Sequence, residues 1–247
     1  MSSLADALRC EHCGETLTLR PVAVAGVGVV TLCRGCEERY NAEVDSVGRV
    51  FVGQKTICEG ASLILKGLSE LYGVDLQSPD LLQTPSRVSR MFVELCRGYN
   101  EDPLAHLKSA LVSADHQDLV VVDTITFTSL CAHHLAVITG TVEIGYLPGA
   151  FWVGLSKFGR MVDSFAKRLQ IQERMTAAIA DCIGCVLQPR GVMVIVRAKH
   201  DCMCKRGATK QDSTTTVSAV RGVFLVNESG IKDEYLAILK AQGRFYD

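Results

Sequence analysis

Two short clusters of cysteine and histidine constrain this chain more than any other feature of its sequence. They are Cys131-Ala132-His133-His134 and His200-Asp201-Cys202. Cys131 and His134 are spaced to flank a tight turn. The apolar run from Val192 predicts a strand, in which His200 and Cys202 point to the same face, because residues i and i+2 share a face. A fold that joins the two clusters forms a Cys₂His site. A tetrahedral zinc ion there keeps its fourth position open for water, as catalytic zinc sites do.

An alternative is that these side chains belong to an ordinary protein core. Free cysteines are commonly small buried residues, and a single histidine is more often a hydrogen-bonded core residue than a ligand. The presence of a second cluster beyond a helical segment favours metal binding. We therefore predict that Cys131, His134 and Cys202 bind a catalytic zinc ion.

The composition limits the class of protein. The 247 residues suffice for one large domain or for a domain with an appendage. A content of 48% hydrophobic and 21% charged residues is ordinary for a soluble globular protein. The net charge of -1 excludes a global attraction to nucleic acid, so any anion site must be local. We expect neither a signal peptide nor a membrane span. Eleven cysteines without a secretion signal indicate a reducing, cytoplasmic environment.

Two Cys-x₂-Cys pairs near the N-terminus predict a zinc ribbon. The four thiols are those of Cys10, Cys13, Cys33 and Cys36. Between the pairs lies a run rich in valine and leucine with a glycine break, which predicts a β-hairpin. A site of four thiolates has no open position, so this zinc would be structural. We expect the segment to stabilise the protein or to bind a protein or nucleic-acid partner.

The remaining chain alternates between helical and β-rich segments. Residues 40–53 suggest a linker or a short strand, and the apolar spacing of 55–72 predicts a helix that Gly73 ends. Thr84 and Pro85 predict the start of another helix. From about residue 119 the sequence is β-rich, and a long helix is expected from Ser156, as its N-cap, to about Leu187. Further strands are expected at 191–200 and about 214–218, and a C-terminal helix at 232–241.

These patterns predict an α+β protein in three parts. They are a zinc-ribbon-like module at 1–45, a helical region at 46–118 and a catalytic domain at 119–247.

Several long motifs resemble the GTP cyclohydrolase I family. They are SLCAHHLAVITGTVEIGYLP, VGLSKFGRMVDSFAKRLQIQERMT, KHDCMCKRG and STTTVSAVRGVF, and the resemblance runs from about Gln54 to the C-terminus. It implies the tunnelling (T-) fold, with an antiparallel sheet and long helices. It also implies a toroidal homodecamer with active sites between subunits. The implied reaction is the hydrolysis of GTP to formate and 7,8-dihydroneopterin triphosphate.

The resemblance also implies roles for individual residues. Cys131, His134 and Cys202 occupy the positions of the zinc ligands, where the metal activates water for attack on the guanine C8. His133 and His200 occupy the positions of catalytic histidines, whose titration near neutral pH suits proton transfer.

Substrate contacts follow from the same resemblance. Gln172 and Glu173 occupy the positions that bind the guanine edge, and a carboxylate can accept hydrogen bonds from its N–H groups. The alternative for Glu173 is a solvated helix charge paired with a neighbouring cation. The expected triphosphate contacts are Ser156, Lys157, Arg160, Arg206, Arg87 and Arg90. Lys157 and Arg160 share a helical face, although basic residues at such positions are commonly just solvated.

One departure from the family pattern lies inside the first cluster. The family commonly has Cys-Glu-His-His, whereas this chain has Ala132 in place of the glutamate. We expect the chemistry to persist, with an effect on rate or substrate preference. The alternatives are a catalytically weakened scaffold, in which the ribbon recruits a partner, and a related enzyme that acts on another purine or pterin. The product could feed folate, tetrahydropterin or 7-deazaguanine synthesis.

Overall fold

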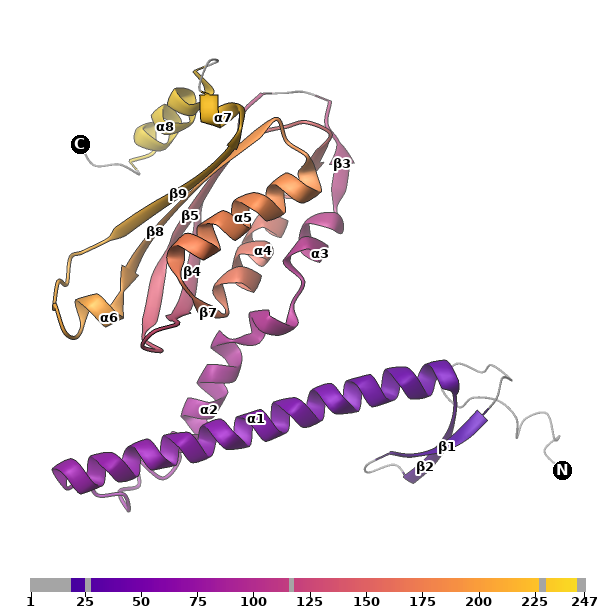
Figure 1. Ribbon diagram of the computed structural model, residues 1–247, viewed down its shortest axis with the longest axis vertical. Coiled ribbons are helices and arrows are strands. Elements are labelled where there is room, and N and C mark those ends of the chain that lie inside the picture. Colours follow the sequence, from indigo (N-terminus) through magenta and orange to yellow (C-terminus); the bar gives the residue numbers. More distant parts are fainter. Residues whose placement is uncertain (1–18, 25–27, 116–117, 227–229, 244–247) are drawn as a thin grey trace. The chain divides into compact units, whose positions relative to one another are not determined.

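The computed structural model describes residues 19–24, 28–115, 118–226 and 230–243, with side chains from residue 52 onward. The described residues form two compact units, one up to Val93 and one from Glu94. Figure 1 shows the elements of each unit in sequence colours.

The first described elements of unit 1 form a β-hairpin, as the sequence predicts. Strands β1 (Leu19–Val24) and β2 (Gly28–Cys33) pair antiparallel, with Leu19 opposite Cys33. The predicted cysteines of the ribbon bracket this hairpin. Cys10 and Cys13 lie outside the described residues. For Cys33, the last residue of β2, and Cys36, in the first turn of the next helix, only the backbone is described. The structural zinc site therefore stays a prediction.

The expectation of a linker or short strand at residues 40–53 is wrong. Helix α1 (Arg34–Tyr72) runs through this segment without a break. The reason is cooperativity: extending a helix adds one hydrogen bond for each residue that is fixed, whereas starting one is costly. The strong helical segment after Lys55 is therefore continued towards the N-terminus through weaker helix formers. Because α1 crosses position 45, the three-part division of the chain stays a prediction.

The second half of unit 1 follows the sequence prediction more closely. Gly73 ends α1 with a positive φ of 71° and donates from its N–H to Ser69 O, a conformation that suits glycine. Helix α2 (Thr84–Leu95) then begins at the predicted place. Ser89 of α2 is buried and donates its hydroxyl to Gln54 O on α1, which joins the two helices.

Unit 2 is built on a five-stranded sheet in the order β7-β4-β5-β8-β9. Its strands are β4 (Val120–Cys131), β5 (Val137–Leu147), β7 (Leu169–Gln170), β8 (Gly191–His200) and β9 (Thr215–Gly222). All neighbours are antiparallel except β4 and β7, which are parallel. A separate antiparallel pair consists of β3 (Leu111–Ser113) and β6 (Phe151–Val153). The predicted α+β class is confirmed.

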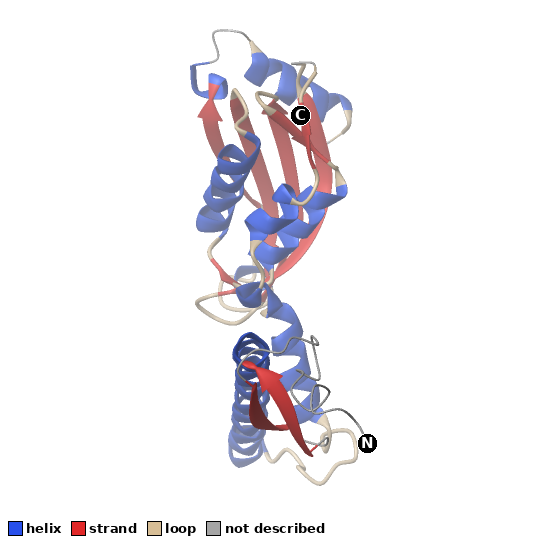
Figure 2. Ribbon diagram, turned by 90° about the vertical axis from the view of Figure 1, so that its right-hand side faces the viewer, coloured by secondary structure: helices blue, strands red, loops and turns tan. Residues whose placement is uncertain are grey.

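Helices cover the sheet in layers, which Figures 1 and 2 show from two directions. The helices of unit 2 are η2 (Arg97–Asn100), α3 (Pro103–Lys108), α4 (Ser156–Ala166), α5 (Gln172–Leu187), α6 (Asp201–Cys204), α7 (Val223–Val226) and α8 (Ile231–Ala241). Of these, α3, α4, α5, α7 and α8 pack on the sheet. Helices α3, α4 and α5 share the larger core with Val192, Val194 and Val196. Met193 and Ile195, on the other face of β8, share a smaller core with α7 and α8. The continuous apolar run of β8 is thus buried on both faces.

The single long helix expected from Ser156 to Leu187 is wrong, because it is two helices. The chain leaves the helix after Ala166, forms the short strand β7 and re-enters a helix at Gln172. Leu169 and Gln170 pair with Leu130 and Cys131 of β4. The break is thus stabilised by pairing with a strand that is distant in sequence.

Arg168 anchors the break from the other side. Its Nε donates to Ser164 O at 2.8 Å, and its guanidinium lies over the rings of Tyr99 and Phe165. The Arg168 carbonyl accepts from the hydroxyl of Ser129, which lies on β4. These contacts offset the lost helical hydrogen bonds, and as a result the start of α5 lies beside the end of β4.

Within the described residues, we find no helix with the length and apolar character needed to span a membrane.

Candidate metal centre and active site

The first cluster forms a tight turn at the end of β4, as its spacing predicts. The N–H of Cys131 donates to Ala136 O at 2.8 Å, and the N–H of Leu135 donates to Cys131 O at 2.9 Å. Leu135 has a φ of 53°, which is rare for a residue with a branched side chain, and its side chain is 49% exposed. The turn presents His134 towards the thiol of Cys131, with Nδ1 at 3.8 Å from Sγ.

The second cluster reaches the same place by a different route from the expected one. The strand β8 ends at His200, so Cys202 does not continue it. Cys202 lies in the single turn of α6, in which the N–H of Lys205 donates to Asp201 O. The prediction that His200 and Cys202 share a strand face is therefore wrong. A helical turn directs the thiol of Cys202 to the end of β4.

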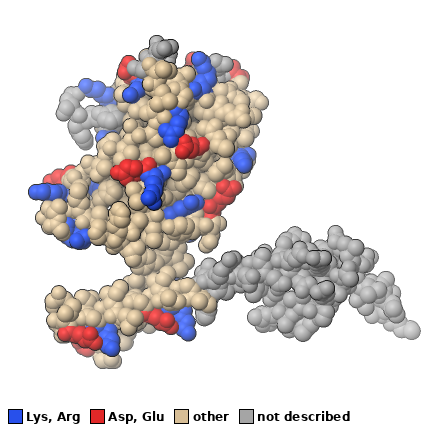
Figure 3. Space-filling view, viewed as in Figure 1, with Lys and Arg blue, Asp and Glu red and all other residues tan. Residues whose placement is uncertain are grey.

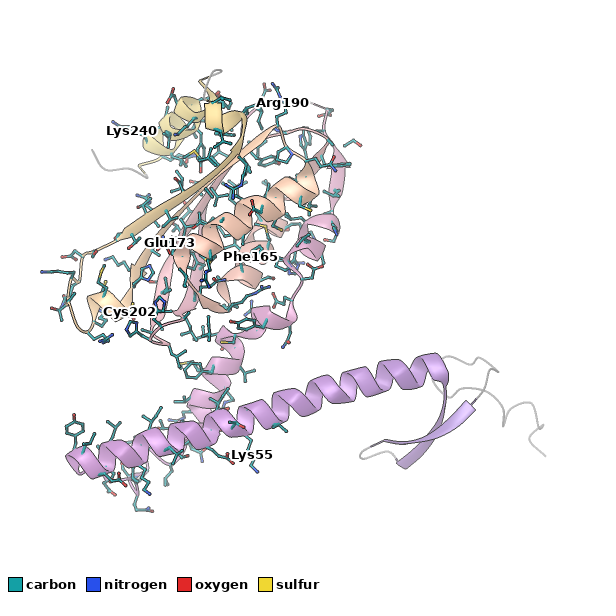
Figure 4. The ribbon with its side chains drawn as sticks, in the orientation of Figure 1. Lys55, Phe165, Glu173, Arg190, Cys202 and Lys240 are labelled. Atoms are coloured by element: carbon teal, nitrogen blue, oxygen red, sulfur yellow. The ribbon has the colours of Figure 1, made fainter. Side chains whose placement is uncertain are left out.

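Three donor atoms converge between the two clusters. The ligand atoms of Cys131, His134 and Cys202 all lie within 4.8 Å of one another. Cys131 is buried, Cys202 is half-buried and His134 is exposed. Figure 4 shows Cys202 on α6 at this end of unit 2. Two thiols and one imidazole suit zinc, which prefers sulfur and nitrogen ligands. The exposed side of His134 leaves access for a fourth ligand.

The electrostatics of the thiols fit a cation site. Burial and the neighbouring thiol of Cys131 raise the pKa of Cys202. Without a cation the Cys202 thiol therefore tends to keep its proton, since burial beside another sulfur disfavours a negative charge there. A bound divalent cation reverses this preference and deprotonates its thiol ligands. Metal binding at this site therefore releases protons.

The two predicted catalytic histidines lie beside this centre but differ in environment. His133 is exposed, and its ring lies edge-on to that of His134 with the centroids 6.2 Å apart. His200 is half-buried at the end of β8. Burial lowers the pKa of the His200 imidazole, and the carboxylate of Glu173 partly opposes this shift. The neutral imidazole is therefore favoured at His200.

Gln172 and Glu173 stand at the start of α5 and face different surroundings. Gln172 is only 2% exposed. Its Nε2 donates to Val196 O at 2.9 Å, and its Oε1 lies 2.7 Å from Nε2 of His200. Glu173 is exposed, and Figure 4 shows it at the same end of unit 2 as Cys202. Of the two predicted guanine contacts, Glu173 is thus open to a ligand, whereas the Gln172 amide is engaged within the protein.

The predicted phosphate contacts are spread over two elements of unit 2 and one of unit 1. Ser156 and Arg160 are exposed and Lys157 is half-buried, all in the first turns of α4, and Arg206 is exposed just after α6. The N-cap of α4 is Leu155, so the prediction that Ser156 caps this helix is wrong. Arg87 and Arg90 lie on α2, where Nη1 of Arg90 donates to Ser86 Oγ. Figure 3 shows basic and acidic side chains interspersed on the visible face of unit 2.

Sequence reasoning missed Gln170, which supports the first cluster. Its carbonyl accepts from the N–H of Ala132 at 3.1 Å, and its Nε2 donates to Phe165 O at 2.6 Å. The first of these contacts depends on the parallel pairing of β7 with β4, which no local sequence pattern signals. Because this contact is made by the backbone, the N–H of residue 132 donates to Gln170 O whichever side chain is present at position 132.

Comparisons with known proteins agree with the resemblance of the motifs. The family model for GTP cyclohydrolase I matches residues 63–240. GTP cyclohydrolase 1 of Porphyromonas gingivalis is 44% identical over 169 residues, which are 68% of this chain and 86% of that protein. The Campylobacter curvus protein of the same name is 43% identical over 177 residues, 72% of this chain and 93% of that protein.

A solved structure of the archaeosine synthase QueF-Like in its apo form is more distantly similar. It aligns with a TM-score of 0.37 and 21% identity, covering 44% of this chain and 97% of that one, which is too low a similarity to support an inference. The family assignment depends on the sequence matches. Because the family model spans most of the chain and the two relatives named GTP cyclohydrolase 1 are 43–44% identical over the aligned residues, the chain belongs to the GTP cyclohydrolase I family.

Proposed function

We propose that this protein hydrolyses GTP to formate and 7,8-dihydroneopterin triphosphate at a zinc centre formed by Cys131, His134 and Cys202. The observation that supports this most is the convergence of their three donor atoms within 4.8 Å. The relatives named GTP cyclohydrolase 1 support the choice of reaction. The open side of the donor set supports a catalytic rather than a purely structural role.

Cys131, His134 and Cys202 would hold the zinc ion, which would supply an activated water for attack on C8 of guanine. His133 and His200 flank the donor set, and we assign them the proton transfers to and from the purine during ring opening. His200 is suited to exchange protons because burial disfavours its charged form, so an acquired proton is readily passed on. Glu173 accepts hydrogen bonds from the N–H groups of the guanine edge.

The triphosphate requires cations close to this centre. We assign this role to Lys157, Arg160 and Arg206, together with Ser156 at the start of α4. The first turn of α4 contains no acidic residue that would repel the phosphate oxygens. From the family resemblance alone, we propose Arg87 and Arg90 of α2 as further phosphate contacts.

We further propose a T-fold homo-oligomer, a decamer in its family form, with the active sites between subunits. The largely antiparallel sheet with helices over it supports the T-fold, as does the family membership. We also propose a second, structural zinc at Cys10, Cys13, Cys33 and Cys36, where a partner protein or nucleic acid could bind. A reducing, cytoplasmic location suits a chain whose thiols hold metal ions.

The test is incubation of the purified, zinc-loaded protein with GTP. We expect a growing pterin absorbance, a matching release of formate and about two zinc ions per chain, the number of sites proposed from the Cys₂His and four-thiolate ligand sets. ATP and reduced pterins serve as comparison substrates. Turnover of one of these without turnover of GTP would indicate a related enzyme with another substrate. Full zinc content without any turnover would indicate a weakened scaffold.

A further inference from the structure

The side chain of Gln172 connects the start of α5 to the predicted catalytic histidine. Its amide nitrogen lies 2.9 Å from Val196 O and 3.1 Å from Thr215 O, and its oxygen lies 2.7 Å from His200 Nε2. We propose that Gln172 is a positioning residue that fixes which ring nitrogen of His200 is offered to the substrate. This proposal deepens the proposed function and rests on it.

The two carbonyls determine the orientation of the amide. Carbonyl oxygens only accept hydrogen bonds, so the group that faces both Val196 O and Thr215 O must be the NH₂, which has two donors. The reversed amide would place its oxygen against two other acceptors in a buried site, where unsatisfied polar groups are costly. The oxygen of Gln172 therefore faces His200.

This orientation determines the tautomer of His200. The amide oxygen can only accept, so Nε2 of His200 must carry a hydrogen to bind it. In the neutral imidazole the other nitrogen, Nδ1, then holds the free lone pair. A proton passed to or from the purine is thus taken up and released at Nδ1, while the Nε2 hydrogen stays in its bond to Gln172.

The backbone around Gln172 is held firmly enough for this role. The hydroxyl of Thr176 donates to Gln172 O at 2.7 Å. Just before it, Leu169 and Gln170 pair with Leu130 and Cys131 at the end of β4. The short segment 169–172 therefore contains both the strand that pairs with β4, which carries the ligand Cys131, and Gln172, the hydrogen-bond partner of His200. The break between α4 and α5 brings these two functions together.

Gln172 and Glu173 are neighbours in sequence, yet the geometry gives them different tasks. The side chain of Gln172 is buried and its amide already makes three hydrogen bonds. The side chain of Glu173 is exposed at the start of α5. We assign recognition of the guanine edge to Glu173, and we assign the orientation of His200 to Gln172.

Matched variants at these two positions test the assignment. Gln172→Met has nearly the same shape but no amide, and we expect kcat to fall about 10- to 100-fold, the usual effect of removing an orienting partner, with little change in KM. Glu173→Gln should instead raise KM for GTP. If Gln172→Met raises KM and leaves kcat unchanged, Gln172 contacts the substrate and the proposal is wrong.

A second variant separates orientation from simple loss of stability. Gln172→Glu keeps an oxygen that can accept from His200, but its second oxygen cannot donate to Val196 O and Thr215 O. Its kcat should therefore lie between those of the wild type and Gln172→Met. Zinc content and melting temperature are measured for both variants. If kcat falls by the same factor in both variants while zinc content and melting temperature stay unchanged, the hydrogen bond to His200 has no role in catalysis and the proposal is wrong.

The tautomer can also be observed without any turnover. The chain has six histidines, so ¹⁵N spectra of the zinc-loaded, histidine-labelled protein are simple, and His200→Gln identifies the signals of His200. We expect the Nε2–H tautomer in the wild type and a mixture in Gln172→Met. A wild-type Nδ1–H tautomer would overturn the proposal. A protein that shows Nε2–H but does not consume GTP would overturn the proposed function alone.

Discussion

Two pairs of cysteines in unit 2 differ in a way that their spacing in the sequence hides. Cys182 and Cys185 are one turn apart on α5 and have the Cys-x₂-Cys spacing of many metal sites. Cys131 and Cys202 are distant in sequence, yet their sulfurs lie within 4.8 Å of each other and of a histidine nitrogen. In the close pair, Cys182 is buried and Cys185 is exposed. The comparison teaches that the metal-ligand set forms where several elements end at one place in the fold. Two cysteines one turn apart on a helix are not enough to form such a set.

The two pairs also differ in what their surroundings favour. Burial, followed by the neighbouring Cys185, raises the pKa of the Cys182 thiol to about 12. Cys182 is therefore neutral at physiological pH and behaves as a small apolar residue in the larger core. The thiol of Cys202 is also favoured in its neutral form, but it lies beside a second thiol and an imidazole, and a cation can overcome that preference.

The largest expected effect is the loss of a metal ligand. Cys202→Ser should lose one zinc per chain and reduce turnover of GTP by more than about 100-fold, because even the removal of an indirect partner of a metal site costs 10- to 100-fold. Cys185→Ser is the matched control and should keep both. Zinc analysis and formate release measure the two quantities. Loss of zinc from the Cys185 variant would show that the close pair binds metal after all.

Thiol labelling should separate the two pairs next. The thiolate is the reactive form, and a pKa of about 12 leaves only about one Cys182 side chain in ten thousand as thiolate at pH 8. Removal of zinc by a chelator should therefore increase labelling at Cys131 and Cys202 and leave Cys182 unlabelled. Mass spectrometry of the labelled peptides identifies each site. Rapid labelling of Cys182 in the folded protein would contradict its burial.

Stability at alkaline pH offers a third test of the same contrast. The folded-state pKa of Cys182, about 12, is above the value of about 8.5 for a free thiol. The unfolded thiol therefore ionises first, so the contribution of Cys182 to stability is complete below about pH 8.5 and decreases as pH rises towards 12. Cys182→Ala should make the unfolding free energy less sensitive to pH in this window. Unfolding by urea at pH 7.5 and 9.5 measures the difference.

At neutral pH the same position should show a moderate packing effect. Cys182→Ser places a hydroxyl in an apolar site and should reduce the free energy of unfolding by about 1–3 kcal/mol. Cys185→Ser lies on an exposed position and should change it by less than about 0.5 kcal/mol. Equal effects of the two substitutions would mean that the two thiols share the same environment.

The smallest effect is expected at the residue that departs from the family pattern. Ala132 is exposed, and its contribution to the first cluster is the N–H that donates to Gln170 O. Ala132→Glu keeps this hydrogen bond, so we expect the zinc content to stay unchanged and kcat to change less than about 10-fold, since no ligand is altered. A gain larger than that would show that the missing carboxylate limits this enzyme.

The longer strands and helices could be predicted from local patterns. The apolar run that became β8 and the alternation in β5 identify strands because a sheet buries side chains on alternate faces, and Gly73 identifies a helix end because it tolerates a positive φ. The continuation of α1 before Lys55 was missed, since valine and glycine, which are weak helix formers, recur in residues 44–53. The break at 167–171 was missed because the helical spacing of apolar residues continues across it.

The candidate site divides in the same way. The residue types of the two clusters and the spacing of Cys131 and His134 are enough to predict a zinc site, and the family membership agrees. The position of Cys202 on a helical turn was not predictable, because a two-residue spacing suits a strand equally well. The burial of Gln172 was not predictable either, since a polar residue at the start of a helix is usually solvated.

The sequence by itself determined which chemistry is available: two thiols, three imidazoles, and strands and helices in a fixed order. These follow from side-chain identity and from interactions between residues close in the chain. The tertiary structure alone decided that one helix becomes two, that the three ligand atoms meet, and that Gln172 faces His200. Each of these depends on backbone pairing or hydrogen bonds between residues far apart in sequence, and local periodicity carries no information about such partners.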